Sequence, residues 1–252
     1  MSEFHITGGT PLHGSVRIGG AKNASYKLMI ASLLADSESR LLNFSRIADV
    51  ELVGEIIKYL GCKVTRSGER AIFIDPKGLN SFEIDKEHGE QGRFSNMFIP
   101  ALLIKFGEAR VPVPGGDKIG KRPLDRHFDG LRALGAEITF KDGMYIAKAK
   151  KLVGTTYRFK KNSHTGTETM IMAAVKAKGK TILENAAMEP EIDDLISYLN
   201  EMGARIRRRS YRVIEIEGVE KLHGAIHKII PDRNEAVSYA CAAIVTKGDV
   251  II

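Results

Sequence analysis

The sequence of 252 residues is poor in cysteine, and its apolar residues do not gather into long runs. Two cysteines, Cys62 and Cys241, provide no disulfide framework, which is typical of a reducing compartment. The longest apolar run, residues 97–104, is interrupted by Pro100 and is far shorter than the roughly 20 residues of a membrane span. No basic stretch followed by an apolar core opens the chain, so no secretory signal is expected. We therefore expect a cytoplasmic protein with no membrane segment.

The overall composition is that of an ordinary globular protein with an excess of positive charge. Hydrophobic residues make up 43% and charged residues 27%, and the net charge is +7. Such an excess favours anionic partners, and composition alone fits either a nucleic acid or a phosphorylated small molecule. The densest basic run, Arg205 to Arg209, falls where a hairpin tip is expected, so we interpret it as a solvated charge cluster.

A pattern recurs three times along the chain. Residues 49–64, 123–138 and 190–206 each combine apolar residues at helical spacing with a glycine directly after the last of them. The glycines are Gly61, Gly135 and Gly203. Glycine in this place is the usual C-terminal stop of a helix. The pattern therefore predicts three amphipathic helices, each followed by a turn.

Each repeated helix is followed by a predicted hairpin and preceded by another helix and a short strand. The hairpins pair residues 62–64 with 71–74, 136–140 with 144–147, and 204–206 with 213–216. The preceding helices and strands cover 22–35 and 40–44, 93–106 and 109–113, and 167–176 and 181–184. A fourth copy starts at 234–245 and reaches only its first strand at 249–252. We expect more chain, or a partner, to complete that copy.

Four sequence blocks along this repeat resemble the enolpyruvyl transferase family, in particular its UDP-N-acetylglucosamine branch. They are Gly19-Gly-Ala-Lys-Asn-Ala24, Pro114 to His127, Glu184 to Glu191, and Pro231 to Ala236. The resemblance covers the whole chain in order. It implies the inverse α/β fold, in which each of two lobes contains three βαβαββ units. By that resemblance, residues 22–229 form a complete first lobe, and residues 1–21 and 230–252 begin the second.

The resemblance also implies a reaction and its substrates. The family's reaction transfers the enolpyruvyl group of phosphoenolpyruvate to the 3-hydroxyl of UDP-N-acetylglucosamine, the first committed step of peptidoglycan precursor synthesis. It requires cations for a phosphate and a carboxylate, an acid for carbon 3 and a base for the hydroxyl. The family's base and a further phosphoenolpyruvate-binding arginine fall in the part of such proteins that follows residue 252. No cofactor and no metal are implied.

By resemblance, phosphoenolpyruvate is expected to bind Lys22, Asn23 and Arg122, and the nucleotide sugar is expected to bind Arg93 and Arg122. Lys22 follows small residues at the start of a predicted helix, where backbone N–H groups attract anions, and Asn23 adds a neutral hydrogen bond. Arg122 follows the glycine-rich loop, and Arg93 opens the matching helix of the second unit. The planar guanidinium of arginine suits phosphates and carboxylates. By resemblance, Arg93 and Arg122 face the two substrates.

Asp117 occupies the position at which most of the family carries a cysteine. By resemblance it is the acid that protonates carbon 3, which requires it to hold its proton when substrate is bound. Burial beside anions raises the pKa of a carboxyl in that direction. An aspartate in a glycine-rich loop is otherwise a common turn former.

The nucleotide sugar is expected to bind two further stretches. By resemblance, the run Arg122-Pro123-Leu124-Asp125-Arg126 holds the uridine and the diphosphate, with Asp125 accepting from the uracil. The second stretch, Lys161-Asn-Ser-His-Thr-Gly-Thr167, departs from the family pattern. Lys161 and Ser163 match, but His164, which is also expected to contact the nucleotide phosphates, replaces an apolar residue. Thr165 and Thr167 bring further donors for phosphate.

Three other functions remain open at this point. The sister transferase acting on shikimate 3-phosphate shares the fold but would lack the Arg-Pro-Leu-Asp stretch. A truncated relative that binds nucleotide sugar without turnover would keep the binding residues only. A nucleic-acid binder would show steep salt dependence, although no groove-reading or aromatic-rich motif supports it.

Overall fold

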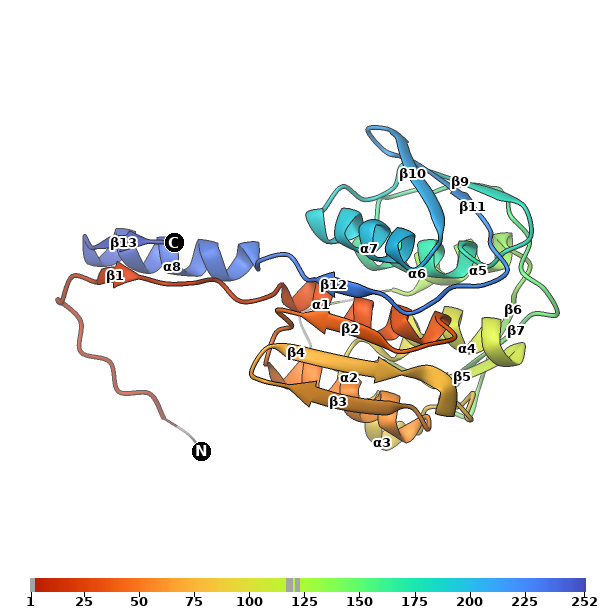
Figure 1. Ribbon diagram of the computed structural model, residues 1–252, viewed down its shortest axis with the longest axis horizontal. Coiled ribbons are helices and arrows are strands. Elements are labelled where there is room, and N and C mark those ends of the chain that lie inside the picture. The colour runs from red at the N-terminus through yellow and green to blue at the C-terminus, as the bar shows by residue number, and fades with distance from the viewer. Residues whose placement is uncertain (1–2, 117–119, 121–122) are drawn as a thin grey trace.

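The computed structural model describes residues 3–116, 120 and 123–252 (Figure 1). Helices fill the interior of a larger body, and sheets lie around them, each with one face toward the helices. A narrow arm, formed by segments near both chain ends, projects from this body. None of the helices in the described ranges combines the length and apolar character needed to cross a membrane.

The sheets of the body repeat one topology. In each, the first strand of a unit pairs antiparallel with the third, which pairs antiparallel with the second. The strands, in sheet order, are β2 (Ser39–Leu42), β4 (Ala71–Asp75) and β3 (Lys63–Ser67); β5 (Glu108–Pro112), β7 (Met144–Lys148) and β6 (Glu137–Lys141); and β9 (Lys180–Glu184), β11 (Val213–Glu217) and β10 (Arg205–Ser210). This order confirms the threefold repeat predicted from the sequence.

Each sheet also gains a short parallel partner beside its first strand, which the sequence patterns did not predict. β8 (Thr156–Arg158) pairs with β9, and β12 (Ile226–Lys228) pairs with β2. In the second unit the partner is reduced to one parallel bridge between Glu83 and Arg110. Strands of three residues are too short to show a period of two. Because β12 follows the third unit, its pairing with β2 closes the body.

The two helices of each unit play different parts. The first helices are α1 (Lys22–Ala31), α4 (Ile99–Phe106) and α6 (His164–Ala174), and the second are α2 (Ala48–Tyr59), α5 (Asp125–Ala133) and α7 (Pro190–Glu201). Every residue of α1 from Ala24 to Ala31 is buried. The second helices are amphipathic, as predicted, and the glycines after them have φ of 96°, 99° and 99° at Gly61, Gly135 and Gly203. Short helical turns complete the body: η1 (Ser32–Leu34), η2 (Pro76–Gly78), α3 (Lys86–Gly89) and η3 (Ser95–Phe98).

Two helix starts differ from the prediction. Arg93 was expected to open a helix but lies in a turn before η3, and α4 begins only at Ile99. Pro100 explains this start, because proline lacks an N–H and is tolerated only in a first turn. Conversely, α6 begins at His164 rather than Thr167, since Ser163 accepts a hydrogen bond from the N–H of Gly166 and caps the helix.

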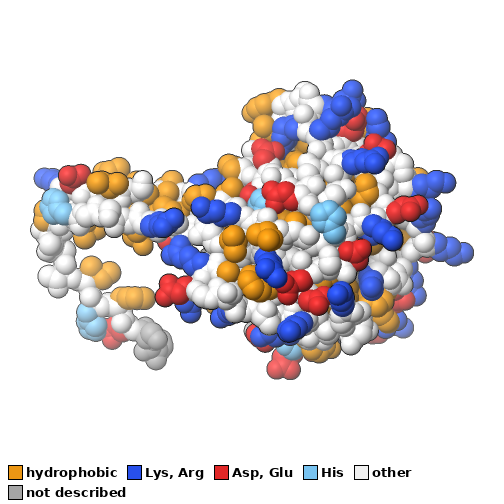
Figure 2. Space-filling model, viewed as in Figure 1, with side chains coloured by type: hydrophobic (Ala, Val, Ile, Leu, Met, Phe, Trp, Pro, Cys, Tyr) orange, Lys and Arg blue, Asp and Glu red, His pale blue; other side chains and the backbone are white. Residues whose placement is uncertain are grey.

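The arm consists of β1 (His13–Ser15), α8 (Arg233–Thr246) and β13 (Asp249–Ile251). β1 and β13 pair in parallel, although they come from opposite ends of the sequence. No residue of α8 is buried, and Cys241 on this helix is exposed. Val237, Ile244 and Val245 are 62%, 75% and 79% exposed, and apolar side chains spread along the arm in Figure 2. Apolar surface of this extent is typical of an interaction face.

Two crossing segments join the arm to the body. The N–H of Ala21 donates to Ile230 O at 2.8 Å, and the N–H of Lys22 donates to Asp232 Oδ2 at 3.0 Å. Gly20 forms an antiparallel bridge with Pro231. A Cβ on Gly20 would overlap the carbonyl oxygen of Asn43, so glycine is required here by the chain's own packing.

His227 fastens β12 to α7. Its Nε2 lies 2.9 Å from Asp194 Oδ1, and its Nδ1 lies 3.0 Å from Glu201 Oε2. Burial lowers the pKa of His227, but the hydrogen bonds and charges of the two carboxylates outweigh it, and the pKa is raised. The protonated ring therefore bridges two acids at the strand that closes the body.

The bridge from His227 to Asp194 and Glu201 predicts that the free energy of unfolding falls at alkaline pH. Its contribution is fully present below about pH 6.5, where an unfolded histidine is also protonated, and is lost as pH rises through the raised pKa of folded His227. Urea unfolding at a series of pH values measures the effect. His227→Gln should lower the free energy of unfolding by about 1–3 kcal/mol at low pH. It should also make that free energy less dependent on pH. His223→Gln, at an exposed position nearby, should keep the pH dependence of the unaltered chain. The same pH dependence in both variants would contradict the role given to His227.

Candidate functional site

A cavity of about 310 Å³ lies where segments from all three units meet, and we call it the main cavity. It is lined by Tyr26, Arg93, Asn96, Pro123, Leu124, Arg126, His127, Ser163 and Thr165. Five of these were predicted substrate-binding residues: Arg93, Pro123, Leu124, Arg126 and Ser163. The described lining carries two guanidinium groups and several hydroxyls but no carboxylate. Such a lining favours an anionic ligand.

His127 organises the buried side of the main cavity. Its Nδ1 lies 2.8 Å from Thr169 Oγ1 and 3.2 Å from Asn96 Nδ2, and its Nε2 lies 3.0 Å from Thr165 Oγ1. An amide nitrogen can only donate, so Nδ1 accepts and the ring proton resides on Nε2. The Nε2–H then donates to Thr165, which orients that hydroxyl at the cavity wall.

The pKa of His127 reports the electrostatics of the site. Burial, followed by the positive charge of Arg93, lowers it from 6.5 to about 4. His127 is consequently neutral near pH 7, in agreement with its hydrogen-bond partners. The block Pro114 to His127 predicted that substrate binds in this region. It assigned no role to His127 or Asn96, because their positions depend on tertiary packing.

A second cavity of about 290 Å³ adjoins the first, and Arg126 lines both. Asp125, Asp129, Tyr157, Lys160 and Lys161 complete its lining. Two more predicted residues, Asp125 and Lys161, are therefore close to the main cavity. A ligand long enough to occupy both cavities would contact Arg126 with its central part, and an anionic group there would suit the guanidinium.

Residues 161–167, the stretch that departs from the family pattern, send some side chains toward the main cavity and others toward the protein interior. Ser163 and Thr165 face the main cavity. His164 instead turns inward, with Nε2 3.1 Å from Glu168 Oε1. The hydroxyl of Thr167 accepts from the N–H of Ala187 at 3.0 Å and is fully buried. Thr167 is therefore not a donor at the main cavity, because its hydroxyl is buried against the connection after β9 and does not line that cavity.

Of the residues expected to hold phosphoenolpyruvate, neither Lys22 nor Asn23 lines the main cavity. Lys22 is at the junction of body and arm, and its Nζ is 2.5 Å from Asp49 Oδ2, with both side chains nearly half exposed. An exposed pair of this kind is weak and can exchange for a bound anion. Asn23 is the second residue of α1 and is half-buried. Asp117 and Arg122 lie outside the described residues.

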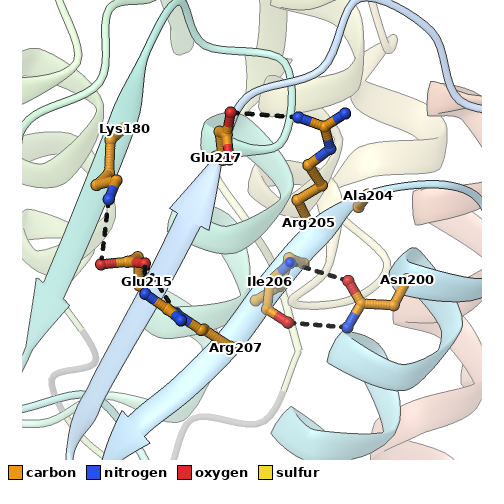
Figure 3. A pocket seen from close by; sticks show the side chains of 8 residues that line it. All are labelled: Lys180, Asn200, Ala204, Arg205, Ile206, Arg207, Glu215 and Glu217. Atoms are coloured by element: carbon orange, nitrogen blue, oxygen red, sulfur yellow. Dashed lines mark hydrogen bonds and ion pairs between the residues drawn. The ribbon is translucent and has the colours of Figure 1, made fainter.

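A larger groove of about 470 Å³ runs along the third sheet and is not the candidate site. Its charges are already paired in Figure 3: Arg205 with Glu217 at 3.2 Å, and Arg207 with Glu215 at 2.5 Å. Lys180 lies 3.6 Å from Glu215. The arginine run thus extends along β10 rather than at the hairpin tip, and much of its charge is balanced by carboxylates on β11.

Two solved structures share the architecture of this chain. The enolpyruvyl transferase NikO from Streptomyces tendae matches with a TM-score of 0.83 at 22% identity, over 93% of this chain and 55% of that one. The EPSP synthase from Acinetobacter baumannii matches with a TM-score of 0.72 at 18% identity, over 91% and 52%. At these identities the likeness shows the fold alone. That fold is the inverse α/β fold of the enolpyruvyl transferases, as predicted.

Sequence comparisons identify the family of the chain. The family model of EPSP synthase (3-phosphoshikimate 1-carboxyvinyltransferase) matches residues 6–252. UDP-N-acetylglucosamine 1-carboxyvinyltransferase 3 of Caldanaerobacter subterraneus subsp. tengcongensis is 48% identical, and the UDP-N-acetylglucosamine 1-carboxyvinyltransferase of Halothermothrix orenii is 42% identical, each over 252 residues. The chain belongs to the EPSP synthase family. It spans about 60% of the length of these curated relatives.

The environment of His127 yields a direct prediction. Its imidazole should remain neutral at pH 7 with the proton on Nε2 and should titrate with a midpoint of about 4. Nitrogen chemical shifts of the ring across a pH series measure both properties. A midpoint near the ordinary value of about 6.5, or a proton on Nδ1, would contradict the described network.

Proposed function

We propose that this chain forms the substrate-binding lobe of a cytoplasmic transferase that moves the enolpyruvyl group of phosphoenolpyruvate onto the 3-hydroxyl of UDP-N-acetylglucosamine. Phosphate is released, and the product enters peptidoglycan precursor synthesis. The main cavity carries this proposal, because three separate units supply it with cations and hydroxyls. The names of the curated relatives support the choice of nucleotide sugar over shikimate 3-phosphate.

The expected roles follow from the chemistry of addition and elimination. In the addition, the sugar oxygen attacks carbon 2, its proton passes to a base, and an acid delivers a proton to carbon 3. In the elimination, carbon 3 loses a proton and the carbon–oxygen bond to phosphate breaks, which restores the double bond. We assign Asp117 as the acid and Lys22, Asn23 and Arg122 to phosphoenolpyruvate. Positive charge beside the leaving phosphate stabilises the transition state.

Binding of the nucleotide sugar is assigned to the two adjoining cavities. Arg126 lines both and suits the diphosphate. Ser163, Thr165 and Lys161 offer donors from the α6 side, and Asp125 offers an acceptor for the uracil. His164 is removed from this contact set, since it faces Glu168.

We propose that residues 22–229 are one lobe and that residues 1–21 and 230–252 begin another. The pairing of β12 with β2 and the exposed apolar side chains of α8 support this division. The family's base is expected in the second lobe. We call the chain joined to the further segment found in its relatives the completed protein.

Turnover by the completed protein tests the function. Phosphate release should require both phosphoenolpyruvate and UDP-N-acetylglucosamine, whereas the 252-residue chain alone should bind nucleotide sugar without turnover. Shikimate 3-phosphate serves as the competing acceptor. Preference for it, or turnover by the chain alone, would overturn the proposal.

Arg126 provides a sharper test of the site. Arg126→Met in the completed protein should raise the KM for UDP-N-acetylglucosamine by about 10-fold or more, because a bidentate cation is lost from both cavities. Arg205→Met, which removes an exposed arginine on β10, is the matched control and should leave KM unchanged. Equal effects of the two variants would place the nucleotide elsewhere.

The aspartate at position 117 predicts resistance to fosfomycin, which inactivates cysteine-type relatives by alkylating the thiol. The completed protein should keep its activity in the drug, and Asp117→Cys should become sensitive. Mass spectrometry after incubation measures the covalent adduct. Stoichiometric labelling of Asp117 itself would contradict this assignment.

A further inference from the structure

An ion pair without access to solvent joins α1 to α6. The ammonium of Lys27 lies 2.7 Å from Glu168 Oε2, and the two side chains are 1% and 0% exposed. Burial lowers the pKa of Lys27, but the charge of Glu168 and the contact with Tyr26 raise it overall, so the lysine is charged. The pair is therefore a true salt bridge inside the helical core.

Stability alone does not account for this pair. Removing two charges from water costs about as much as their attraction returns, and apolar residues of similar volume at such positions are commonly as stable or more stable. Both positions lie on helices whose residues are almost all buried. An ion pair differs from apolar side chains in requiring one defined geometry between the helices that carry it.

The pair lies directly behind the main cavity. Tyr26, the neighbour of Lys27, lines that cavity, and the Lys27 ammonium lies 5.1 Å from the centre of the Tyr26 ring. On the α6 side, His164 Nε2 lies 3.1 Å from Glu168 Oε1 and 3.4 Å from Lys27 Nζ. His164 stands between Ser163 and Thr165, which both line the cavity.

A second ion pair continues this network toward the arm. Glu191 on α7 is 1% exposed, and its Oε1 lies 3.1 Å from Nε of Arg233 on α8. Glu191 thus places a buried carboxylate on α7, which packs against both α1 and α6. The contacts behind the cavity wall come from Lys27 on α1, whose ammonium lies 2.7 Å from Glu168 and 3.4 Å from His164.

We propose that Lys27 and Glu168, together with His164, are positioning residues that fix the first turn of α6 against α1 and so set Ser163 and Thr165 for the phosphates of the nucleotide sugar. This rests on the proposed function. None of the three needs to touch the substrate. Their role is to hold the hydroxyl donors in the geometry that the diphosphate requires.

The double variant Lys27→Met/Glu168→Leu in the completed protein tests this role, because it removes both charges and leaves neither unpaired. The thermal midpoint should not fall, whereas the KM for UDP-N-acetylglucosamine should rise about tenfold, since small misplacements of binding groups have large effects. The KM for phosphoenolpyruvate should change less than about twofold. A structural role alone would not separate these two constants.

Two further variants make the result decisive. Lys27→Gln/Glu168→Gln keeps an uncharged polar side chain at both positions and decides the question if the first double variant does not fold. Tyr198→Phe removes a buried hydrogen bond of 2.7 Å between Tyr198 and Ser32. Neither residue lines the main cavity. This variant should lower the thermal midpoint without changing KM.

The outcomes separate the two proposals. If the unaltered completed protein does not use the nucleotide sugar, the proposed function fails and this inference fails with it. If the unaltered protein does use it and a folded double variant has the same KM, positioning by Lys27 and Glu168 is wrong while the function stands. If neither double variant folds, the pair is structural and the inference is also wrong.

Discussion

Burial of the first helix of each unit is the constraint on which the rest of the structure depends. α1, α4 and α6 are covered on nearly all sides, so their residues must be apolar or must have polar partners within the protein. Where such a helix begins, polar groups concentrate. Ser163 caps α6, Asp232 accepts from the first N–H of α1, and the main cavity opens beside the segments that precede α4 and α5.

The same constraint explains how the surrounding elements are arranged. A buried helix needs cover, and each unit provides it with a second, amphipathic helix and an antiparallel sheet. Gly61, Gly135 and Gly203 reverse the chain at the end of each second helix, where a positive φ is needed. One unit repeated three times therefore brings residues of all three units to one region of the lobe, with Tyr26 of α1 beside the segments that precede α4, α5 and α6, and the cavity lies there.

Much of this organisation could be predicted because it leaves local signals. Helical spacing and the glycine stops identified the second helices, and pairs of β-rich runs around a polar turn identified the hairpins. β8 and β12 were missed, since their pairing is decided by distant strands rather than by their own three residues. The start of α4 was missed because a single proline overrode a longer apolar pattern.

The site was predicted less completely than the fold. Arg93, Arg126 and Ser163 reach the main cavity, as a shared motif suggested, but Asn96, His127 and Tyr26 enter it only through packing. His164 stood in a loop pattern and was expected to face phosphate. Its actual direction is set by Glu168 on the next turn, a partner that becomes apparent only once α6 is known to begin at His164.

The central claim is that the main cavity and its neighbour receive a nucleotide sugar, and a titration of UDP-N-acetylglucosamine followed by amide NMR tests it most directly. The account predicts saturable shifts at Arg126, His127, Ser163 and Thr165, with Lys180 and Arg205 in the groove of the third sheet unchanged. Shifts confined to that groove, or none at the cavity residues under saturating ligand, would contradict it.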